Sequence, residues 1–433
     1  MRGLILILAC ACIRPLAAQQ PDTGVTTTLQ VTLDEAVRRA LDVQPAMVQA
    51  RGDQSNSGAA KRSAWGAFLP SINASGSATR SNQPFRIQGD TTTYPPAYTF
   101  SGGFTASLDV FAGFRRIANL RASSANLDAA DAGAVNQRFQ VTLLTKQVFY
   151  NALATEELVH VAESQVKRAE QQLRISIQKL HAGSATRSDS LRSTVDYGNA
   201  RIALLQAQAD LANAQANLGR QIGVDQAVRA VPDTLQPLLP DTAILRAAAL
   251  ESAPQVEQAD ASARAARAEV LSARSQYWPS FNVSYSNTRT GTDNPSLPLL
   301  GNYKESFQWR FGLSWTLFNG FSREQQQVSA SVARDVAEAR TADTRRQVNA
   351  SLTQQIAALG TSYEQIDIAR SNVAAATEDV RVQQERYRVG AGTILDLLTS
   401  QASLTQAQTD LVQARFNYLI ARAQLEALLG RSL

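Results

Sequence analysis

The chain turns back on itself at residues 386–398, which read Arg-Tyr-Arg-Val-Gly-Ala-Gly-Thr-Ile-Leu-Asp-Leu-Leu. Apolar residues stand seven apart on both sides of this stretch: Leu352, Leu359, Ile366, Val373, Val380 and Tyr387 before it, and Leu397, Leu404, Leu411, Tyr418 and Leu425 after it. A strict seven-residue period is typical of helices in left-handed coiled coils. Gly390 and Gly392 give the backbone the freedom that a reversal needs, and Thr393 is a suitable N-cap for the returning helix. The stretch therefore predicts a helical hairpin.

A second copy of this hairpin lies 207 residues earlier in the chain. Three positions of the two copies correspond at that offset: Gly183 and Gly390, Thr186 and Thr393, and Asp189 and Asp396. The motif Phe-x-Gly-Phe also occurs twice, starting at Phe111 and at Phe318, and 72 residues separate each copy from its hairpin glycine. A constant offset across separate landmarks indicates an internal duplication.

Each repeat is expected to contain two strands, one very long helix and one return helix. For the first repeat, residues 19–236, we expect strands at about 71–81 and 100–111, the long helix at about 114–180 and the return helix at about 186–220. For the second repeat, residues 237–433, we expect strands at about 280–290 and 306–318, the long helix at about 321–388 and the return helix at about 393–429. Each long helix would extend roughly 100 Å, at about 1.5 Å per residue.

The first 18 residues are expected to be a signal peptide. Arg2 supplies the positive end, residues 4–11 are a short apolar run, and residues 16–18, Leu-Ala-Ala, form a small-residue cleavage site. A lipoprotein signal is the alternative, because Cys10 follows a Leu-Ala pair. Cleavage after residue 18 would leave the mature chain without thiols, since Cys10 and Cys12 are its only cysteines.

Charge and motif content argue against nucleic-acid binding and catalysis. The net charge of +5, which falls to +3 without Arg2 and Arg14, is small for 433 residues. The two histidines, His160 and His181, are far apart and belong to no set of residues at metal-ligand spacing. The sequence holds no Gly-x-Ser-x-Gly motif and no phosphate-binding glycine loop. We therefore expect no enzyme activity, no cofactor, no metal site and no nucleic-acid partner.

The last predicted strand, residues 306–318, alternates between apolar and polar side chains along its whole length. Its apolar positions are Phe307, Trp309, Phe311, Leu313, Trp315 and Leu317. A tilted transmembrane β-strand needs about ten residues, with apolar side chains toward lipid and polar ones toward a lumen. This pattern predicts a lipid-facing strand. The alternative is a half-buried strand of a soluble sheet, which alternates in the same way.

Four predicted strands cannot close a membrane barrel alone, because the smallest single-chain barrels have eight. Open sheet edges cannot face hydrocarbon, where each unpaired backbone group costs several kcal/mol. We therefore expect the chain to associate with copies of itself. Three copies give twelve strands around an interior wide enough to hold water.

The motifs resemble those of the TolC-type outer-membrane efflux protein family over nearly the whole mature chain. The resemblance rests on the segment Thr32–Ala36, the two Pro-Ser strand entries, the Phe-x-Gly-Phe strand exits and the Gly-x-x-Thr-x-x-Asp hairpins. It implies an α+β membrane protein in which a transmembrane β-barrel in the cell outer membrane continues into the periplasm as a long coiled-coil α-helical barrel. It also implies a homotrimer that docks on a periplasmic adaptor (membrane fusion) protein and an inner-membrane transporter. The implied function is the passive exit duct of a tripartite efflux or type I secretion system, opened at its periplasmic tip.

The resemblance further implies roles for hairpin residues. Tyr387 and Asp189 match a pair that holds the periplasmic entrance shut, and Asp396 matches an aspartate that lines this entrance. The tips that would contact the adaptor are Gly183, Ser184, Val389, Gly390 and Ala391. The alternative for Asp189 and Asp396 is that they are first-turn acids, favoured there by the helix dipole.

A second interpretation of the whole chain stays open. An exported periplasmic coiled-coil scaffold, whose strands pair with other proteins, would have the same helices and no channel activity. The sequence does not specify the transported substrate, the adaptor or the class of pump.

Overall fold

The structure is a computed structural model, and it describes residues 29–80, 86–88, 91–93, 98–232, 253–292 and 304–433. The expected signal peptide at residues 1–18 and the expected boundary between the repeats at residues 236 and 237 lie outside these ranges.

Two helices of 67 residues run the length of the molecule, α3 (Arg115–His181) and α7 (Ser322–Arg388). Each turns at a hairpin into a return helix of 36 residues, α4 (Arg187–Ile222) or α8 (Ile394–Leu429). The bounds agree with the expected ones to within two residues at each end. The equal lengths agree with the internal duplication of the chain.

Three shorter helices precede the strands. They are α1 (Leu33–Val43), α2 (Pro45–Gly66) and α6 (Pro254–Arg274), the last of which continues into a 3₁₀ turn, η1 (Ser275–Tyr277). A proline opens both α2 and α6, where its fixed φ fits the first helical turn and no N–H is needed.

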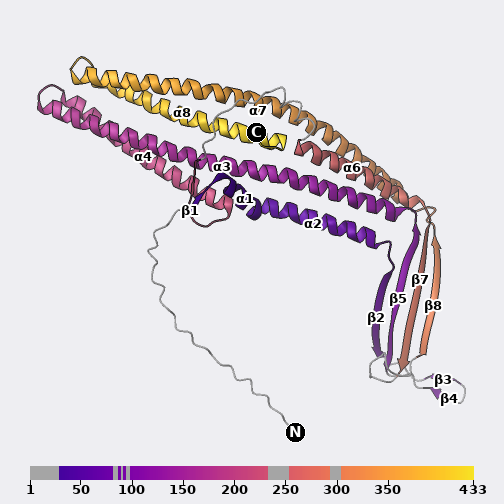
Figure 1. The fold of residues 1–433 in the computed structure, drawn as a ribbon. Coiled ribbons are helices and arrows are strands. Elements are labelled where there is room, and N and C mark those ends of the chain that lie inside the picture. Colours follow the sequence, from indigo (N-terminus) through magenta and orange to yellow (C-terminus); the bar gives the residue numbers. More distant parts are fainter. Residues whose placement is uncertain (1–28, 81–85, 89–90, 94–97, 233–252, 293–303) are drawn as a thin grey trace, which may run out of the picture.

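The helices form one curved layer that is four helices wide (Figure 1). Helices α3 and α7 run along the whole layer, and the space between them is filled by α8 near the hairpins and by α6 near the sheet. On the other side of α3, the corresponding places are taken by α4 and α2. The order across the layer is therefore α7, then α6 or α8, then α3, then α2 or α4.

A four-stranded antiparallel sheet extends from the end of the layer opposite to the hairpins (Figure 1). Its strands lie in the order β2 (Ser71–Arg80), β5 (Tyr98–Ala112), β7 (Ser280–Thr292) and β8 (Lys304–Ser314). Two small sheets complete the described strands: β1 (Leu29–Val31) pairs in parallel with β6 (Val228–Ala230), and β3 (Arg86–Gln88) pairs with β4 (Thr91–Thr93).

The last strand ends earlier than its sequence pattern predicts. Strand β8 stops at Ser314, so Trp315 and Leu317, which we expected on the lipid-facing strand, lie in the connection to α7. The reason is the partner strand. Ser314 pairs with Ser280, the first residue of β7, and Pro279 before it has no N–H to continue the ladder.

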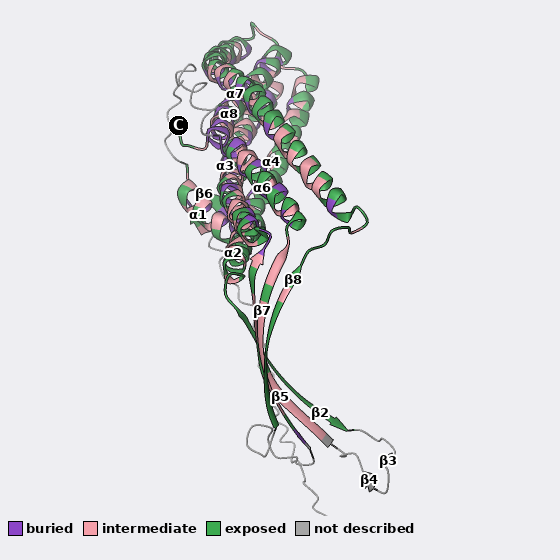
Figure 2. Cartoon of the chain, turned by 90° about the vertical axis from the view of Figure 1, so that its right-hand side faces the viewer, coloured by how far each residue is buried: buried purple, intermediate pink, exposed green. Residues whose placement is uncertain are grey.

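The hydrophobic core belongs to the helices and not to the sheet. One cluster of buried side chains joins α7 and α8 around Leu352, Leu359 and Tyr418, and another joins α3 and α4 around Phe149 and Leu218. Among the described residues of the large sheet, Ala112 is the one buried hydrophobic side chain. Figure 2 shows this contrast between buried positions in the helices and exposed or intermediate positions in the strands. The expected heptads therefore fill the coiled-coil core.

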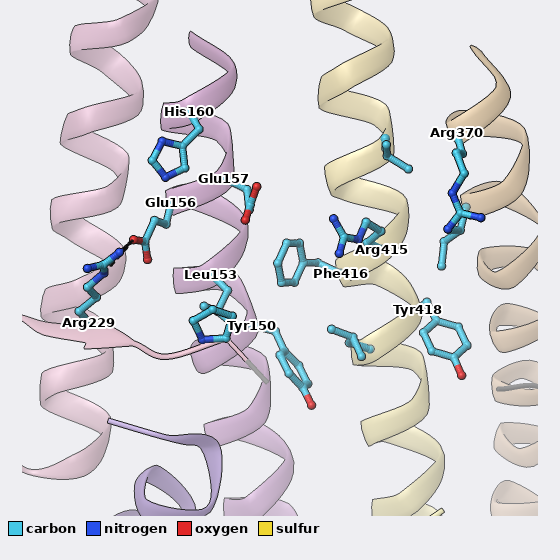
Figure 3. A pocket seen from close by; sticks show the side chains of 14 residues that line it. Tyr150, Leu153, Glu156, Glu157, His160, Arg229, Arg370, Arg415, Phe416 and Tyr418 are labelled. Carbon is cyan, nitrogen blue, oxygen red and sulfur yellow. Dashed lines mark hydrogen bonds and ion pairs between the residues drawn. The ribbon is translucent and has the colours of Figure 1, made fainter. Parts of the chain in front are cut away.

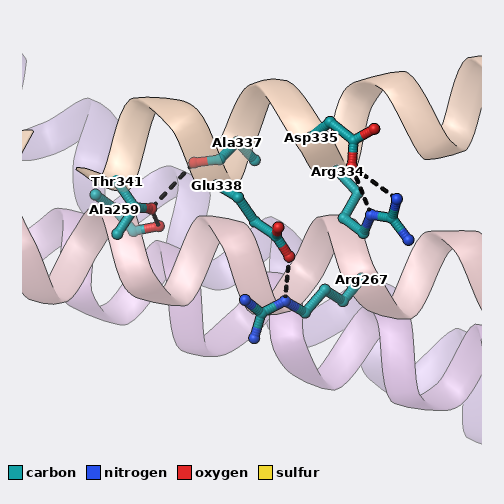
Figure 4. A network of polar contacts seen from close by, with 7 residues as sticks. All are labelled: Ala259, Arg267, Arg334, Asp335, Ala337, Glu338 and Thr341. Atoms are coloured by element: carbon teal, nitrogen blue, oxygen red, sulfur yellow. Dashed lines mark hydrogen bonds and ion pairs between the residues drawn. The ribbon is translucent and has the colours of Figure 1, made fainter. Parts of the chain in front are cut away.

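Polar contacts fix α6 against α7 (Figure 4). The hydroxyl of Thr341 on α7 donates to the carbonyl of Ala259 on α6 at 3.1 Å, and it also reaches the carbonyl of Ala337 at 3.0 Å. One turn away, Arg267 of α6 forms an ion pair of 2.7 Å with Glu338 of α7. Thr341 is buried whereas the ion pair is exposed, so the hydroxyl contact contributes more to the position of α6.

Both Phe-x-Gly-Phe motifs turn the chain from strand to helix in the same way. The second phenylalanine of each motif, Phe114 or Phe321, has a φ of 65° and caps the following long helix. The preceding glycines, Gly113 and Gly320, also have positive φ, of 58° and 65°. Two consecutive left-handed residues make a sharp turn, and a side chain at the first of them would be strained.

The duplication supplies a matched pair of substitutions at this turn. A Cβ at Gly113 would lie 2.6 Å from the carbonyl oxygen of Ser275, whereas a Cβ at Gly320 would meet no atom within 4 Å. Gly320→Ala should therefore cost about 1 kcal/mol for the backbone conformation alone, and Gly113→Ala should cost about 1–3 kcal/mol more. Thermal unfolding of the two purified variants measures the difference. Equal losses would show that the contact at Gly113 relaxes without cost.

Candidate functional site at the hairpin tips and the sheet

The two hairpin tips have the same hydrogen-bonded turn. In the first, the Asp189 N–H donates to Thr186 Oγ1 at 3.2 Å and the Thr186 N–H donates to Asp189 Oδ2 at 3.0 Å. In the second, the two equivalent distances between Thr393 and Asp396 are both 3.2 Å. These are capping boxes, which satisfy free N–H groups at the start of α4 and α8. Both aspartates therefore have a structural role in the turn.

Asp396 is exposed at the second tip, as its expected role at an entrance requires. The hydroxyl of Thr393 donates to its carboxylate at 2.8 Å. This bond is the largest cause that lowers the pKa of Asp396 below its ordinary value, followed by the backbone N–H of Thr393 and, more weakly, the charge of Arg386. The carboxylate therefore stays ionised at neutral and mildly acidic pH.

Tyr387 and Asp189, the pair expected to hold the entrance shut, influence each other through charge in the described structure. Tyr387 is 6% exposed and packs with Ile394 and Leu397, and its hydroxyl has no hydrogen-bond partner among the described residues. Burial raises the pKa of Tyr387, and the negative charge of Asp189 raises it further. The two side chains are therefore coupled by charge, while the Asp189 carboxylate is engaged in its own capping box.

A residue that sequence reasoning missed makes the contact between the two tips. Lys179, in the last turn of α3, donates from Nζ to the carbonyl oxygen of Tyr387 on α7. The same Nζ lies 4.3 Å from the centroid of the Tyr387 ring. A basic residue in the last turn of a helix is a recognisable signal, but it predicts contact with its own helix end.

The expected tip residues are at the surface. Gly183, Ser184, Val389, Gly390 and Ala391 are all exposed, and Val389 is 66% exposed. They lie at the two turns that end the helical layer, as far from the sheet as the chain reaches (Figure 1). The structure thus brings all five to one end of the molecule.

The sheet has one apolar face and one polar face. Paired residues of an antiparallel sheet share a face. One row crosses all four strands as Ile72, Ala106, Tyr285 and Trp309, and the Tyr285 and Trp309 rings are 4.9 Å apart. A row of the opposite face reads Asn73, Thr105, Ser286 and Gln308. The alternation predicted for the last strand therefore extends to the whole sheet.

No described part of the chain covers the apolar face of β8. Phe307, Trp309, Phe311 and Leu313 of β8 are 59–75% exposed. A soluble protein does not leave a continuous row of large apolar side chains in water without a partner or a membrane. The alternative of a half-buried strand in a soluble sheet does not fit this exposure.

Aromatic side chains gather where the sheet meets the helices. Phe111 and Phe114 pack edge to face with ring centroids 5.2 Å apart, and the equivalent pair, Phe318 and Phe321, does so at 5.4 Å. Trp278 packs against Phe114 at 5.7 Å. Trp278, Phe318 and Phe321 are more than half exposed. Aromatic residues at this level are typical of a membrane–water boundary.

A cavity of about 500 Å³ lies between α3 and α8 at the middle of the helical layer (Figure 3). Apolar side chains such as Leu153 and Phe416 line it beside charged ones, and Arg229 forms an ion pair of 2.6 Å with Glu156 across its edge. Within the described residues no group of three His, Cys, Asp or Glu side chains is placed to hold a metal ion. No described helix is long and apolar enough to cross a membrane.

The comparisons identify the family. A family model described as outer membrane efflux protein matches residues 16–224 and 245–431. The chain belongs to this family. Outer membrane efflux proteins lie in the outer membrane and extend into the periplasm, which is therefore the location of this protein. The family is defined by efflux and not by a chemical reaction.

Individual relatives are distant. Protein CyaE of Bordetella pertussis is 27% identical over 317 residues, which cover 72% of this chain and 65%, less than two thirds, of CyaE. The toluene efflux pump outer membrane protein TtgC of Pseudomonas putida is 24% identical over 371 residues, or 84% of this chain and 75% of TtgC. The Campylobacter jejuni CmeC outer membrane channel has a TM-score of 0.80 at 16% identity, over 92% of this chain and 85% of CmeC. The likeness to CmeC shows the fold, a helical barrel segment joined to a β domain.

The capping box allows a direct test of what sets the charge of Asp396. Thr393→Ala removes the hydroxyl that contributes most to the low pKa, so the pKa of Asp396 should rise toward its ordinary value of 3.8. The rise should be partial, because the Thr393 N–H still donates to the carboxylate. The stability that the low pKa contributes is present above 3.8 and is lost as the pH falls through the folded value.

Titration of the carboxyl carbon of Asp396 by NMR measures this change. Thr186→Ala at the first hairpin is the matched control and should leave the Asp396 titration as it is in the unaltered protein. An unchanged titration in Thr393→Ala would show that the hydroxyl does not hold the carboxylate.

Proposed function

We propose that the chain is one third of a passive exit duct, in which three copies close into a tube through the outer membrane and the periplasm. The observation that carries the proposal is that the open edges of the chain match one another. Each repeat supplies a long helix and the shorter helices beside it. At both outer edges of the helical layer, one helix face has no described helix packed against it.

A comparison of the two repeats identifies these unpacked helix faces. Helices α6 and α8 lie between α3 and α7 and are covered on both sides, whereas their repeat counterparts α2 and α4 have α3 as their one long neighbour and otherwise make smaller contacts with α1 and β6. The side of α7 away from α6 and α8 has no described helix against it. If the second repeat is followed by the first repeat of another copy, α2 and α4 of that copy fill this place. Such a head-to-tail contact closes into a ring.

The apolar side chains at these edges support the same contact. On α4, Leu191, Val195, Ile202 and Leu205 form a stripe that is 56–67% exposed and opposite to the face packed on α3; we name it the α4 stripe. On α7, Val328, Val332 and Val336 near the sheet and Ile368 and Val382 near the hairpin are 40–62% exposed and lie opposite to its buried heptad; we name these five the α7 stripe, and the α4 stripe would face its hairpin part. Two exposed stripes at coiled-coil spacing on the two open edges favour packing of one against the other.

The sheet has the same two open edges. Among the described residues, strand β2 pairs only with β5, and strand β8 pairs only with β7. Because the sheet has an even number of strands, β8 of one copy meets β2 of the next in the antiparallel sense. Three copies supply twelve strands, enough for a closed barrel with a wet interior. The same neighbour then closes the helical layer and the sheet.

We further propose that the apolar face of the closed sheet contacts outer-membrane lipid and that its polar face lines the lumen. Phe307, Trp309, Phe311 and Leu313 on β8 lie on the lipid side by register. Trp315 and Leu317 lie in the connection between the sheet and the helices, at the level of the aromatic side chains described above. They would contact the boundary between lipid and water. The polar lumen follows from the rows of Ser, Thr, Asn and Gln.

The hairpin tips then form the periplasmic entrance, where a periplasmic adaptor and an inner-membrane transporter dock. Support comes from the exposed tip residues Gly183, Ser184, Val389, Gly390 and Ala391 and from the family membership. Three copies of Asp396 at this entrance would attract cations, as acidic rings do in channels. Asp189 and Tyr387 would set its closed state through the charge coupling described above. No step of this function needs a cofactor or a chemical reaction.

The scaffold alternative is disfavoured by the sheet. A periplasmic scaffold would have to cover the large apolar side chains of β8 with another protein, and a duct covers them with lipid. The duct also explains why β2 and β8, at opposite edges, are both left open.

Reconstitution of the purified full-length protein in planar bilayers tests the function. We expect a detergent-stable trimer from the outer-membrane fraction that forms small-conductance, cation-selective pores. Asp396→Asn should lower the cation selectivity, because it removes three charges from the entrance, and Asp410→Asn, farther along α8 and also exposed, is the control. A monomeric, water-soluble protein without conductance would exclude the duct and leave the scaffold.

A charge in the α4 stripe tests the contact between copies. Ile202 is 67% exposed in the single chain, so Ile202→Glu should leave the fold of the chain intact. In the trimer it would bury a carboxylate against the α7 stripe of the next copy, at a cost of several kcal/mol, and trimers should be lost. Ala203→Glu, at the exposed neighbouring position, is the control and should assemble. Size-exclusion chromatography with light scattering gives the oligomeric state, and trimeric Ile202→Glu would contradict the contact.

A further inference from the structure

We propose that Lys179 holds the two hairpin tips of one chain together and sets how readily the entrance between them opens. The proposal rests on the duct function proposed above and adds a positioning residue to its entrance. It assigns to Lys179 the cross-hairpin contact that Tyr387 and Asp189 do not make.

The ammonium group of Lys179 makes two favourable contacts with Tyr387. Lys179 Nζ donates to the carbonyl oxygen of Tyr387 and lies over the ring of the same residue, 4.3 Å from its centroid. Tyr387 is in the last turn of α7, where the carbonyl groups form the negative end of the helix dipole. The ammonium group of α3 thus caps the end of α7 and covers an aromatic face at once. Both contacts break if the tips separate.

The packing around Lys179 makes this contact important. The residues of α3 that approach the second hairpin near the tip include Arg168, Gln172, Ile175 and Lys179, and Ile175 is the one apolar side chain of these four. Gln172 is 2% exposed, and its amide nitrogen has no partner among the described residues. At the middle of the layer, α3 instead buries Phe149 and Leu153. Little apolar area therefore holds the tips together, and a single cationic contact contributes a larger share.

Two further cations at the tips bond within their own hairpin, whereas Arg168, farther along α3 from the tip, donates to Thr405 and Gln408 of α8 at 3.1 and 3.4 Å. Arg386, the repeat counterpart of Lys179, approaches Gln383 at 3.4 Å and the carbonyl of Ala391 at 3.5 Å. Arg388 forms an ion pair of 2.8 Å with Glu385. Gly392, in the second turn, has no side chain to contribute. Lys179 is thus the cation that links the ends of α3 and α7 in the described structure.

The test is single-channel recording of Lys179→Met in the full-length assembled protein, without adaptor. Methionine keeps the length of the side chain and removes the charge. The mean conductance or open fraction should rise about fivefold, the shift expected from one lost cation at a helix C-terminus. Lys179→Arg keeps both contacts and should remain near the unaltered protein. Lys167→Met removes a charge from an exposed position of the same helix and should have no effect.

The possible outcomes distinguish a failure of the role of Lys179 from a failure of the proposed duct function. Lys179→Met with unaltered conductance, or Lys167→Met with the same increase, would overturn the role of Lys179 while the duct stands. Absence of pores from the unaltered protein would overturn the duct and the proposal together. Trimer melting controls for folding, and if Lys179→Met does not assemble, Lys179→Gln replaces it. Glutamine keeps an N–H donor without the charge, so its conductance should be intermediate, and an unaltered value would again reject the role.

Discussion

The structure depends on a sheet that its own chain neither covers nor closes. Backbone groups at the edges of a sheet need partners, and large apolar side chains need an environment other than water. The four strands offer two open edges and a continuous apolar face, while the hydrophobic core lies in the helices. The single chain is therefore incomplete, and the environment of the sheet decides its function.

The helical layer obeys the same constraint through its repeats. A helix in this layer is packed on both sides when it has a neighbour on each, as α6 and α8 have between α3 and α7. The duplicated chain contains this arrangement once. At the outer edges, α2 and α4 have a long helix on one side, and the outer side of α7 has no described helix against it. In the proposed duct, closure by further copies would repeat a contact that the chain already contains, so the interface between copies would need no new type of packing.

The hairpin tips combine a firmly fixed turn with a weak contact between turns. Each turn is held locally by a capping box and by a glycine with positive φ. Between the tips α3 buries polar residues such as Gln172 and Ser176, and it contributes Ile175 to the small apolar cluster of Tyr387, Ile394 and Leu397. A rigid turn on a loosely joined end suits an entrance whose parts move without unfolding.

Several features of the site escaped sequence reasoning for physical reasons. Alternation predicted the strand through Leu317, but pairing with β7 ended it at Ser314, because a strand exists only as far as its partner. The sequence did not indicate that the Tyr387 hydroxyl has no hydrogen-bond partner among the described residues or that the Asp189 carboxylate accepts from the Thr186 N–H. The contact of Lys179 joins residues that are 208 positions apart, and no local pattern indicates such a pair.

The sequence by itself determined the helices, the hairpins and the duplication, because heptad spacing, capping residues and glycines act over a few neighbouring residues. The alternation of apolar and polar side chains likewise determined which face of the last strand is apolar. Only the tertiary structure decided which helices lie side by side, that Tyr285 and Trp309 share one row, and which cation reaches across to α7. Those relations depend on how distant segments pack, and packing is fixed by the whole chain at once.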